Sequence, residues 1–557
     1  MGRWWKSGHN GNARLISKAS LAAGSVAAML LMAACGDKEA DQASGNTTET
    51  VAAAAIDPAQ APIIQKAIED YLQLIEGPAD QRIVHHGAVK VTPGSDAFDV
   101  SIDGVYVGPA GEGRLDVGTI GYKLTPKGSD GYFASNLTHA PSIPFKDKDG
   151  KETGALTFTT KAFSGEWSSS LQTFLSLDWQ AADIVAKDNS PDGGNFTASG
   201  LNTSLASTDK GSGLFDQNGK FELIGFSAKE TEGGTFALGK VAGTIDMTGI
   251  KLKEYVTKMR EMQTLMSEIA ESTAKAQAAA EAAAKAAVES GNAAPTVAVT
   301  TGISDEQSAK LGGMIKGMAG IVAGVAYDFA LTDISFKEKD GSEPFRLAKG
   351  DFKTSFTGLD AEKANFNFAL GHDGLVVNDP DMARNPLFAK LLPASGKLDL
   401  NLTDVPSKEL WALIGDNFPG LITADPARSE AAAGVMFVAM QQLLQKAPMK
   451  LTVAPSGLTS ELLQLDATGA FDVKPEAIFG VVGALDVNLH GLDEAMKLAN
   501  EAAQSSPDAA QIVGGLAMIQ SMAKRETGTD GKPVDKLKLE VDAAGDAKVN
   551  GMSMSGQ

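Results

Sequence analysis

The 557-residue sequence predicts an α+β fold: large antiparallel β-sheets, curved or meandering, with repeated strand-turn-helix units that pack their helices on one sheet face. Three observations predict this fold. A strand-turn-helix pattern occurs three times, apolar and polar residues alternate through much of the chain, and one long helical stretch is rich in alanine. The predicted domains are residues 61–252, 253–302 and 303–551, which follow a signal peptide and a tether.

The repeat begins with a short strand of the pattern Gly-x-Ile/Leu-Asp, followed by a turn and a helix. A second helix, rich in Gly and Ala, comes next, and a further strand ends each unit. The three initial strands are Gly243–Met247, Gly396–Leu400 and Gly483–Val487, with the shared carboxylates Asp246, Asp399 and Asp486. A repeat of this size is typical of duplicated supersecondary units stacked around a common core. We expect its aspartates to face solvent or to cap the next turn.

The N-terminus has the features of a signal peptide over residues 1–34. Basic residues precede an apolar run at 19–31 that is too short to span a membrane. The run ends in Leu-Met-Ala-Ala-Cys35-Gly36, which resembles a bacterial lipoprotein signal and predicts that Cys35 becomes the lipidated N-terminus. An ordinary secretory signal cut after Ala34 is the alternative. In enterobacterial lipoproteins Asp after the Cys favours the inner membrane, so Gly36 favours the outer membrane.

A flexible tether is predicted for residues 35–60, which are rich in Ala, Thr, Glu, Asp and Gln and have no apolar periodicity. A helix then begins at Pro62 and stops before Gly77-Pro78. From about Val84 to Leu252, alternating apolar and polar residues are separated by Asp-Gly and Asn-Gly turns. This pattern predicts a large antiparallel meander whose strands each have one exposed face.

The longest helical stretch covers residues 254–289, at the start of the predicted helix-and-linker insertion 253–302. Its first half has apolar residues at alternating spacings of four and three, whereas its second half is mostly alanine. We expect the first half to pack on the protein's own sheet and the Ala-rich half to project into solvent. A partner helix along the heptad seam is the alternative.

The second helix of each repeat carries two methionines four residues apart, which lie on one helix face. The pairs are Met314 and Met318, Met436 and Met440, and Met518 and Met522. Methionine fills irregular gaps, and nearby glycines allow close backbone approach. These features favour helices packed tightly on a sheet. The alternative is an apolar groove between sheet and helices that holds an acyl chain, lined by the six methionines.

The charge of the chain excludes some partners. The formal net charge is -20, and because residues 1–34 hold four basic and no acidic side chains, the remainder carries -24. Nucleic-acid phosphates and anionic lipid head groups both require clustered Lys and Arg. We therefore expect no binding to nucleic acid and no direct adhesion to anionic head groups.

Catalytic motifs are missing from the sequence. There is no zinc-protease, phosphate-loop, dinucleotide-binding or nucleophile-elbow pattern. His85 and His86 are adjacent, so they point to opposite faces of a strand, and Ser-x-x-Lys occurs without the partner motifs of β-lactamases. Asp147 starts a segment like a calcium loop, but Glu152 follows too early to close it, which favours a hairpin turn. We predict a non-enzymatic protein with no catalytic residue, metal or cofactor.

The C-terminal part carries a family resemblance. Its ending, with the strand 537–541, Ala544-Gly-Asp and Val549-Asn-Gly, follows the strand-turn-helix unit that starts at Gly483. Over about residues 220–552 this pattern resembles proteobacterial envelope proteins of unknown function that have β-repeats and are distantly similar to AsmA-type proteins. The AsmA likeness implies curved sheets with an apolar concave face and lipid handling between membranes. AsmA-type proteins are typically anchored by a transmembrane helix, whereas this chain has a lipoprotein-like signal.

The function expected from the sequence is that of a bacterial cell-envelope lipoprotein facing the periplasm. Its partners would be the membrane, through the lipid anchor, and a hydrophobic ligand such as phospholipid that it binds or transfers. A structural, scaffold or assembly lipoprotein that acts through protein-protein contacts is the alternative. A contiguous apolar groove favours the first function, and a filled core with a large exposed apolar patch favours the second.

Overall fold

The computed structural model describes most of the chain after residue 55. The described residues are 56–76, 82–109, 113–128, 130–189, 194–230, 233–289, 304–378, 386–421, 426–474, 477, 480–504, 507–528 and 531–553. The predicted signal peptide and the lipidation site Cys35 lie outside them. Strands dominate, and every strand pairing between described residues is antiparallel. The prediction of a β-rich, antiparallel fold with repeated strands is confirmed.

The chain forms two compact units. Unit 1 consists of residues Met1–Glu232, Ala242–Ala323 and Trp411–Phe437. Unit 2 consists of Gly233–Val241, Gly324–Leu410 and Val438–Gln557. The strand β11 (Thr235–Lys251) and the helices α8 (Ser407–Leu421) and α9 (Pro426–Lys446) each contribute residues to both units.

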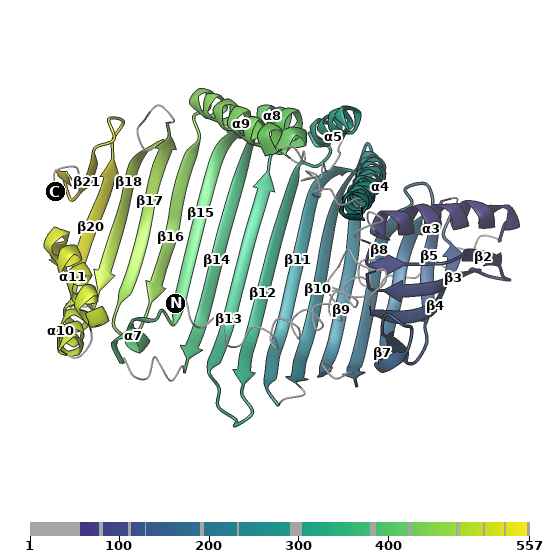
Figure 1. The fold of residues 1–557 in the computed structure, drawn as a ribbon, viewed down its shortest axis with the longest axis horizontal. Helices are drawn as coiled ribbons and strands as arrows, with labels where there is room; N and C mark the ends of the chain where they lie inside the picture. The colour runs from purple at the N-terminus through teal and green to yellow at the C-terminus, as the bar shows by residue number, and fades with distance from the viewer. Residues whose placement is uncertain are drawn as a thin grey trace, which may run out of the picture. The chain divides into compact units, whose positions relative to one another are not determined.

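Unit 1 is built on a meander of antiparallel strands (Figure 1). Its strands besides β11 are β1 (Val84–His85), β2 (Val89–Pro93), β3 (Phe98–Val107), β4 (Arg114–Pro126), β5 (Gly131–Thr138), β6 (Ile143–Lys146), β7 (Glu152–Ser168), β8 (Thr173–Asp188), β9 (Gly194–Gly211) and β10 (Leu214–Glu230). The longest hairpins, β7–β8 and β9–β10, pair along nearly their whole length. At the turn between β9 and β10, Gly211 and Gly213 have positive φ angles of 83° and 76°, which glycine adopts without strain.

The core of unit 1 lies under helix α3 (Ala61–Glu76), whose start is within one residue of the predicted one. Its apolar residues at helical spacing, Ile64, Ile68 and Leu72, are at most 3% exposed. The ring of Trp167, 1% exposed, lies edge-on to Tyr71 of α3 at 5.2 Å between ring centroids. Edge-to-face pairs of this kind add to the burial energy of the rings, so α3 is held firmly on the strands.

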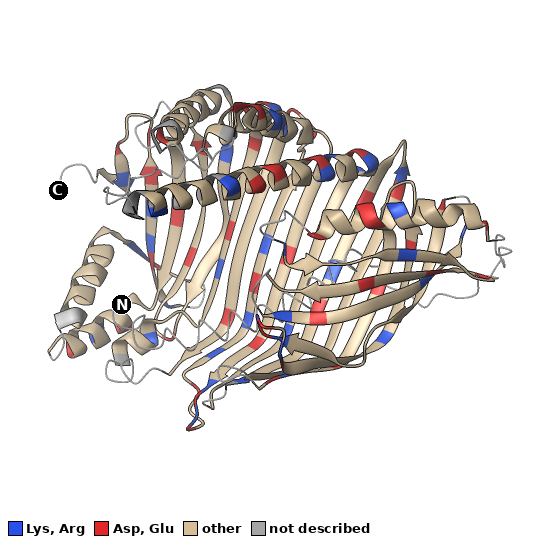
Figure 2. Ribbon diagram, turned by 45° about the vertical axis from the view of Figure 1, so that its right-hand side comes forward, with Lys and Arg blue, Asp and Glu red and all other residues tan. Residues whose placement is uncertain are grey.

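Two further helices of unit 1 follow β11, as the repeat predicts. They are α4 (Leu252–Glu289) and α5 (Asp305–Met318), and they pack against each other. Ser304 and Gln307 form a reciprocal capping box that starts α5. In the first half of α4, Leu265 is 3% exposed, whereas the described side chains of its Ala-rich half are exposed. Acidic and basic residues alternate along this helix (Figure 2).

Unit 2 continues the antiparallel pattern. Its strands after β11 are β12 (Gly324–Lys337), β13 (Phe345–Thr357), β14 (Lys363–Val377), β15 (Ser395–Pro406), β16 (Lys450–Thr459), β17 (Gln464–Val473), β18 (Val481–His490), β19 (Lys524–Thr527), β20 (Pro533–Val541), β21 (Ala547–Val549) and β22 (Met552–Ser553). From β12 to β18 each strand pairs with the next, and β18 then pairs with β20. This sequential order gives long rows of directly opposed residues.

Three helices of unit 2 pack on one another. They are α7 (Pro386–Leu391), α10 (Leu492–Ala503) and α11 (Pro507–Met522). Leu387, Leu492, Ala499 and Leu516 form their shared buried cluster. In Figure 1 these three helices lie beside the strand ends of unit 2 and not across its strands. The apolar residues of α7, α10 and α11 bury one another, whereas the sequence analysis expected α10 and α11 to pack on one sheet face.

All three strand-turn-helix repeats are present. Their initial strands are parts of β11, β15 and β18, and the helices that follow are α4, α8 and α10. The second helices are α5, α9 and α11, and β12, β16 and β20 end the units, with the short β19 inserted in the third. In the second and third units the helix pair lies between two strands that pair with each other, β15 with β16 and β18 with β20.

A carboxylate links β10 to β11 within unit 1, which gives a pH prediction. Lys210 pairs with Asp216 at 2.8 Å, and the Gly249 backbone N–H donates to this carboxylate at 2.9 Å. These two bonds hold the pKa of Asp216 below its ordinary value of 3.8. The ionised carboxylate therefore stabilises the fold fully above pH 3.8, and this contribution is lost as the pH falls below 3.8 through the lowered pKa of the folded state. We expect Asp216→Asn to lower the free energy of unfolding by up to about 1 kcal/mol at neutral pH, and denaturant titrations should show the difference shrinking near pH 3.

Candidate functional site

The strands of unit 2 place large apolar side chains on one face. In antiparallel sheets, directly opposed residues share a face. The register sets Phe329 opposite Phe352, Phe352 opposite Leu370, and Leu370 opposite Leu398. A second row runs from Phe368 through Leu400 toward the later strands. Four consecutive strands therefore contribute apolar residues to one continuous surface.

We call this surface the apolar face of unit 2. Its residues are Tyr327, Phe329, Leu331, Phe352, Phe356, Phe366, Phe368, Leu370, Leu398, Leu400, Leu402, Leu451, Val453, Leu458, Leu465, Phe471, Leu485, Val487, Leu489, Leu537, Leu539 and Val541. Only two of them, Val487 and Leu489, are buried. Leu370 is 49% exposed, Leu458 44% and Leu398 40%. The described chain leaves most of this face partly uncovered.

Aromatic rings link the strands of the apolar face. Phe352 lies edge-on to Phe368 at 5.5 Å between ring centroids, and Phe356 lies edge-on to Phe366 at 5.1 Å. These preferred geometries hold the rings upright across β13 and β14. A soluble monomer rarely leaves a contiguous apolar surface above a few hundred Å² exposed, so this face is a candidate interaction site.

The opposite face of unit 2 is polar. Lys353 pairs with Asp328 across β12 and β13, and Lys397 lies 3.3 Å from Asp399. The repeat carboxylates lie on polar surfaces: Asp399 accepts a 3.2 Å hydrogen bond from Asn367, and Asp486 is exposed, opposite Lys538. Asp246 of unit 1 accepts a hydrogen bond from Asn218. The aspartates thus keep one face of their strands polar.

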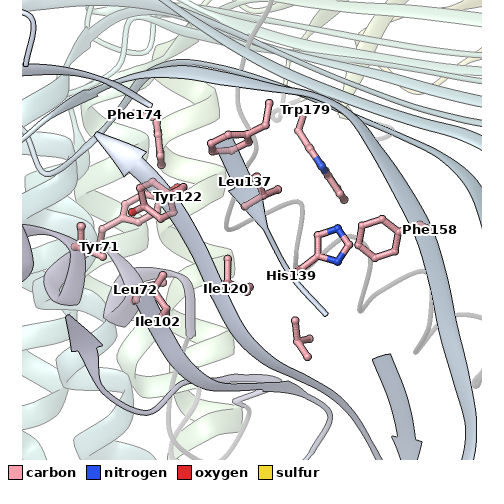
Figure 3. Close-up of a pocket in the computed structure, with 13 residues that line it drawn as sticks. Tyr71, Leu72, Ile102, Ile120, Tyr122, Leu137, His139, Phe158, Phe174 and Trp179 are labelled. Carbon is pink, nitrogen blue, oxygen red and sulfur yellow. The ribbon is translucent and has the colours of Figure 1, made fainter. Parts of the chain in front are cut away.

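Unit 1 contains a partly enclosed apolar cavity (Figure 3). Its volume is about 80 Å³, and it opens to solvent. Its lining residues come from α3, β3, β4, β5, β7, β8 and the residue that follows β5: Ile68, Tyr71, Leu72, Ile102, Val117, Ile120, Tyr122, Leu137, His139, Phe158, Phe163, Phe174 and Trp179. No lining side chain is acidic, and the only basic one is an imidazole. An apolar cavity of this volume exceeds the roughly 10–15 Å³ that one water needs.

The polar atoms of the cavity wall are mostly bonded within the protein. His139 Nδ1 lies 2.8 Å from the Ala140 carbonyl oxygen, and its Nε2 lies 3.1 Å from Thr160 Oγ1. Trp179 Nε1 points to the same hydroxyl at 3.5 Å. Burial raises the pKa of the Tyr122 phenol, which stays a neutral donor. No described residue hydrogen-bonds that hydroxyl.

The six methionines of the predicted groove do not contribute to this cavity. None of them lines it, and none is buried. Met314 lies instead in an open hollow between α4 and α5, and Met518 of α11 is 55% exposed. An added Cβ at Gly514 or Gly515 would meet nothing within 4 Å. These glycines therefore do not serve close backbone approach, contrary to the sequence-based interpretation.

The other candidate residues have structural partners. The His85 ring stacks on Tyr106 with 4.3 Å between ring centroids, and His86 Nε2 lies 3.3 Å from Glu76 Oε1. The two imidazoles therefore contact different partners. Asp147 accepts backbone hydrogen bonds from Asp149 and Lys151, both at 2.9 Å. This arrangement is the predicted hairpin turn.

Lysines of the three Ser-x-x-Lys tetrapeptides are ion-paired. Lys210 pairs with Asp216, Lys275 with Glu271 and Lys524 with Glu526. Within the described part of the chain, no group of three or more His, Cys, Asp or Glu residues could hold a metal ion. Among the same residues, no helix combines the length and apolar character that crossing a membrane requires.

Neither protein families, nor curated proteins, nor solved structures give a significant match to this chain. The case for a functional site therefore rests on the apolar face of unit 2 and the cavity of unit 1. Sequence analysis identified the strands that carry both, but not the residues that converge on them. Leu370, Leu398 and Leu458 could have been found from alternation, once the register of their strands was known.

Proposed function

We propose that this protein is a non-enzymatic lipoprotein of the bacterial cell envelope that binds the acyl chains of a lipid, such as a phospholipid, on the apolar face of unit 2. Cys35 would anchor it, and residues 36–60 would tether the folded body in the periplasm, with the outer membrane favoured by Gly36. Binding on a water-exposed body allows the lipid to be transferred between membranes. The likeness to AsmA-type proteins implies the same kind of role.

The observation that carries this proposal is the partial exposure of the apolar face. Side chains such as Phe368, Leu370 and Leu398 are 38–49% exposed although they stand in continuous apolar rows. Covering such a surface gains about 25 cal/mol for each Å² of apolar area removed from water. Acyl chains supply that cover without hydrogen-bonding groups, which matches the continuous rows of Phe and Leu side chains on β12 to β15.

A scaffold or assembly lipoprotein is the second candidate function. Helix α9 favours it, because Val435 is 60% exposed and Phe437 65% exposed on its surface in unit 1. Exposed aliphatic and aromatic side chains on a helix are typical of a surface that docks a partner protein. Under this function the apolar face of unit 2 would contact protein and not lipid.

Purification followed by lipid analysis tests the proposal. The chain from residue 36 onward, without signal peptide and Cys35, is directed to the periplasm by an unrelated cleavable signal and purified without detergent. Mass spectrometry of a solvent extract is expected to find a phospholipid in an amount comparable to that of the protein. A folded protein free of lipid, which also takes up none from phospholipid vesicles, would contradict lipid binding and favour the scaffold function.

A further inference from the structure

We propose that the cavity of unit 1 is a second, separate binding site, for a neutral acyl compound: a hydrocarbon chain that bears one carbonyl oxygen and no charge. This site shares no residue with the apolar face of unit 2. Its occupation therefore does not depend on the function proposed for that face.

The cavity wall determines the hydrocarbon part of the ligand. In Figure 3, Tyr71, Leu72 and Ile102 lie toward one side of the cavity, and His139, Phe158 and Trp179 toward the other. The wall between them is also apolar, so the space suits an extended chain better than a polar molecule. The cavity of about 80 Å³ holds part of such a chain, and the rest of the chain extends through the opening toward solvent.

The chemistry of the wall excludes a charged head group. No Lys or Arg lines the cavity, so an ionised carboxylate or phosphate would lose its hydration without gaining a partner. The hydrogen bonds of His139 and Trp179 to Thr160 and Ala140 already occupy the polar atoms of those side chains. Tyr71, the other phenol of the wall, also has an interaction within the protein. Among the lining residues, polar recognition is therefore left to a single group.

That group is the Tyr122 hydroxyl. Tyr122 lines the cavity and packs its ring near Phe163, at 6.2 Å between centroids. Burial keeps the phenol protonated, and no described residue hydrogen-bonds its oxygen. A neutral phenol donates one hydrogen bond, which a carbonyl oxygen accepts. One donor in an apolar cavity selects a ligand with one neutral acceptor.

Tryptophan fluorescence can test the site, because Trp179 is part of its wall. Beyond residue 5, the chain has two other tryptophans, Trp167 and Trp411. The probe is the methyl ester of a medium-chain fatty acid with bromine atoms near its methyl end, since bromine quenches tryptophan on contact. In the chain from residue 36 we expect saturable quenching by this ester, and the larger part of it should be lost in Trp179→Phe.

Two variants distinguish binding in the cavity from binding elsewhere. Leu137→Phe fills part of the cavity. The ester concentration needed for half-maximal quenching should rise at least about tenfold, which is roughly the effect of one steric clash in a filled site. Ile63→Phe makes a similar change on α3, where Ile63 is 54% exposed, and should leave binding unchanged. Circular dichroism of both variants checks that they fold. Equal quenching in the wild type, Leu137→Phe and Trp179→Phe would overturn the proposal.

The role of the hydroxyl is tested by Tyr122→Phe, which keeps the ring. This variant should bind the brominated ester roughly three- to tenfold more weakly, which is the effect of losing one neutral hydrogen bond. It should bind a brominated alkane of equal length with unchanged affinity. Equal weakening for ester and alkane would overturn the assignment of Tyr122 as the ligand's donor. Charged substitutions on the apolar face of unit 2 should not change this quenching, so the two proposals fail independently.

Discussion

Replacing both Leu370 and Leu398 with lysine is expected to remove bound lipid from the purified protein. The two residues are opposed on β14 and β15 in the apolar face of unit 2. Each ammonium group would have to leave water for an acyl-covered surface or bend away from it, and both responses disrupt the cover. We expect the amount of lipid recovered, and the affinity for phospholipid vesicles, to fall by roughly tenfold or more, a change of about 1.4 kcal/mol or more.

This double substitution should leave the fold intact. Leu370 is 49% exposed and Leu398 40%, and substitutions at such positions usually change the free energy of unfolding by about 0.5 kcal/mol or less. The control is Ser355→Lys on β13, which adds one lysine charge on the polar face. Lipid loss in the control as large as in the double variant, or no loss in the double variant, would rule out the apolar face as the lipid site.

Local sequence patterns predicted the elements of the fold well. The start of α3 at Ala61, the extent of α4 and the three repeat units follow from helix periodicity, turn residues and alternation, which are properties of neighbouring residues. The packing of helices was predicted less well. Flanking glycines suggested close approach of the methionine helices to a sheet, whereas Gly514 and Gly515 of α11 face open space. Which surface a helix contacts depends on long-range packing that its own sequence does not specify.

The candidate sites depended on long-range information in the same way. Phe329, Phe352 and Leu370 are each unremarkable apolar strand residues, and only the register of β12, β13 and β14 aligns them in one row. The cavity is still harder to predict from sequence, because lining residues such as Tyr71 and Trp179 are more than a hundred residues apart in the chain. Alternation shows that a strand has an apolar face, but not what covers that face or whether it is left open.

Gly483→Ala is expected to destabilise unit 2 strongly, because this repeat glycine lies against a neighbouring strand. A Cβ at residue 483 would come within 2.2 Å of the Ala470 carbonyl oxygen and 2.7 Å of the Phe471 Cα, and both are backbone atoms that cannot move aside. The strands β17 and β18 would have to separate, at a cost of roughly 1–3 kcal/mol. Hydrogen–deuterium exchange should show faster exchange of backbone amides in peptides from β17, β18 and β20.

The other glycines of unit 2 provide graded controls for this prediction. At Gly396, the equivalent position in the second repeat, a Cβ would meet Leu458 Cδ2 at 2.7 Å and His372 Cε1 at 2.6 Å, both atoms of side chains that can rotate. Gly396→Ala should therefore have a smaller effect. At Gly514, in helix α11, a Cβ meets nothing within 4 Å, so Gly514→Ala should stabilise the helix by roughly 0.5–1 kcal/mol. Equal changes of exchange rate in the three variants would show that close strand packing is not the reason for a glycine at this repeat position. The expected order, with the largest effect at Gly483, would show that the glycine permits the close spacing of strands that carry the apolar face.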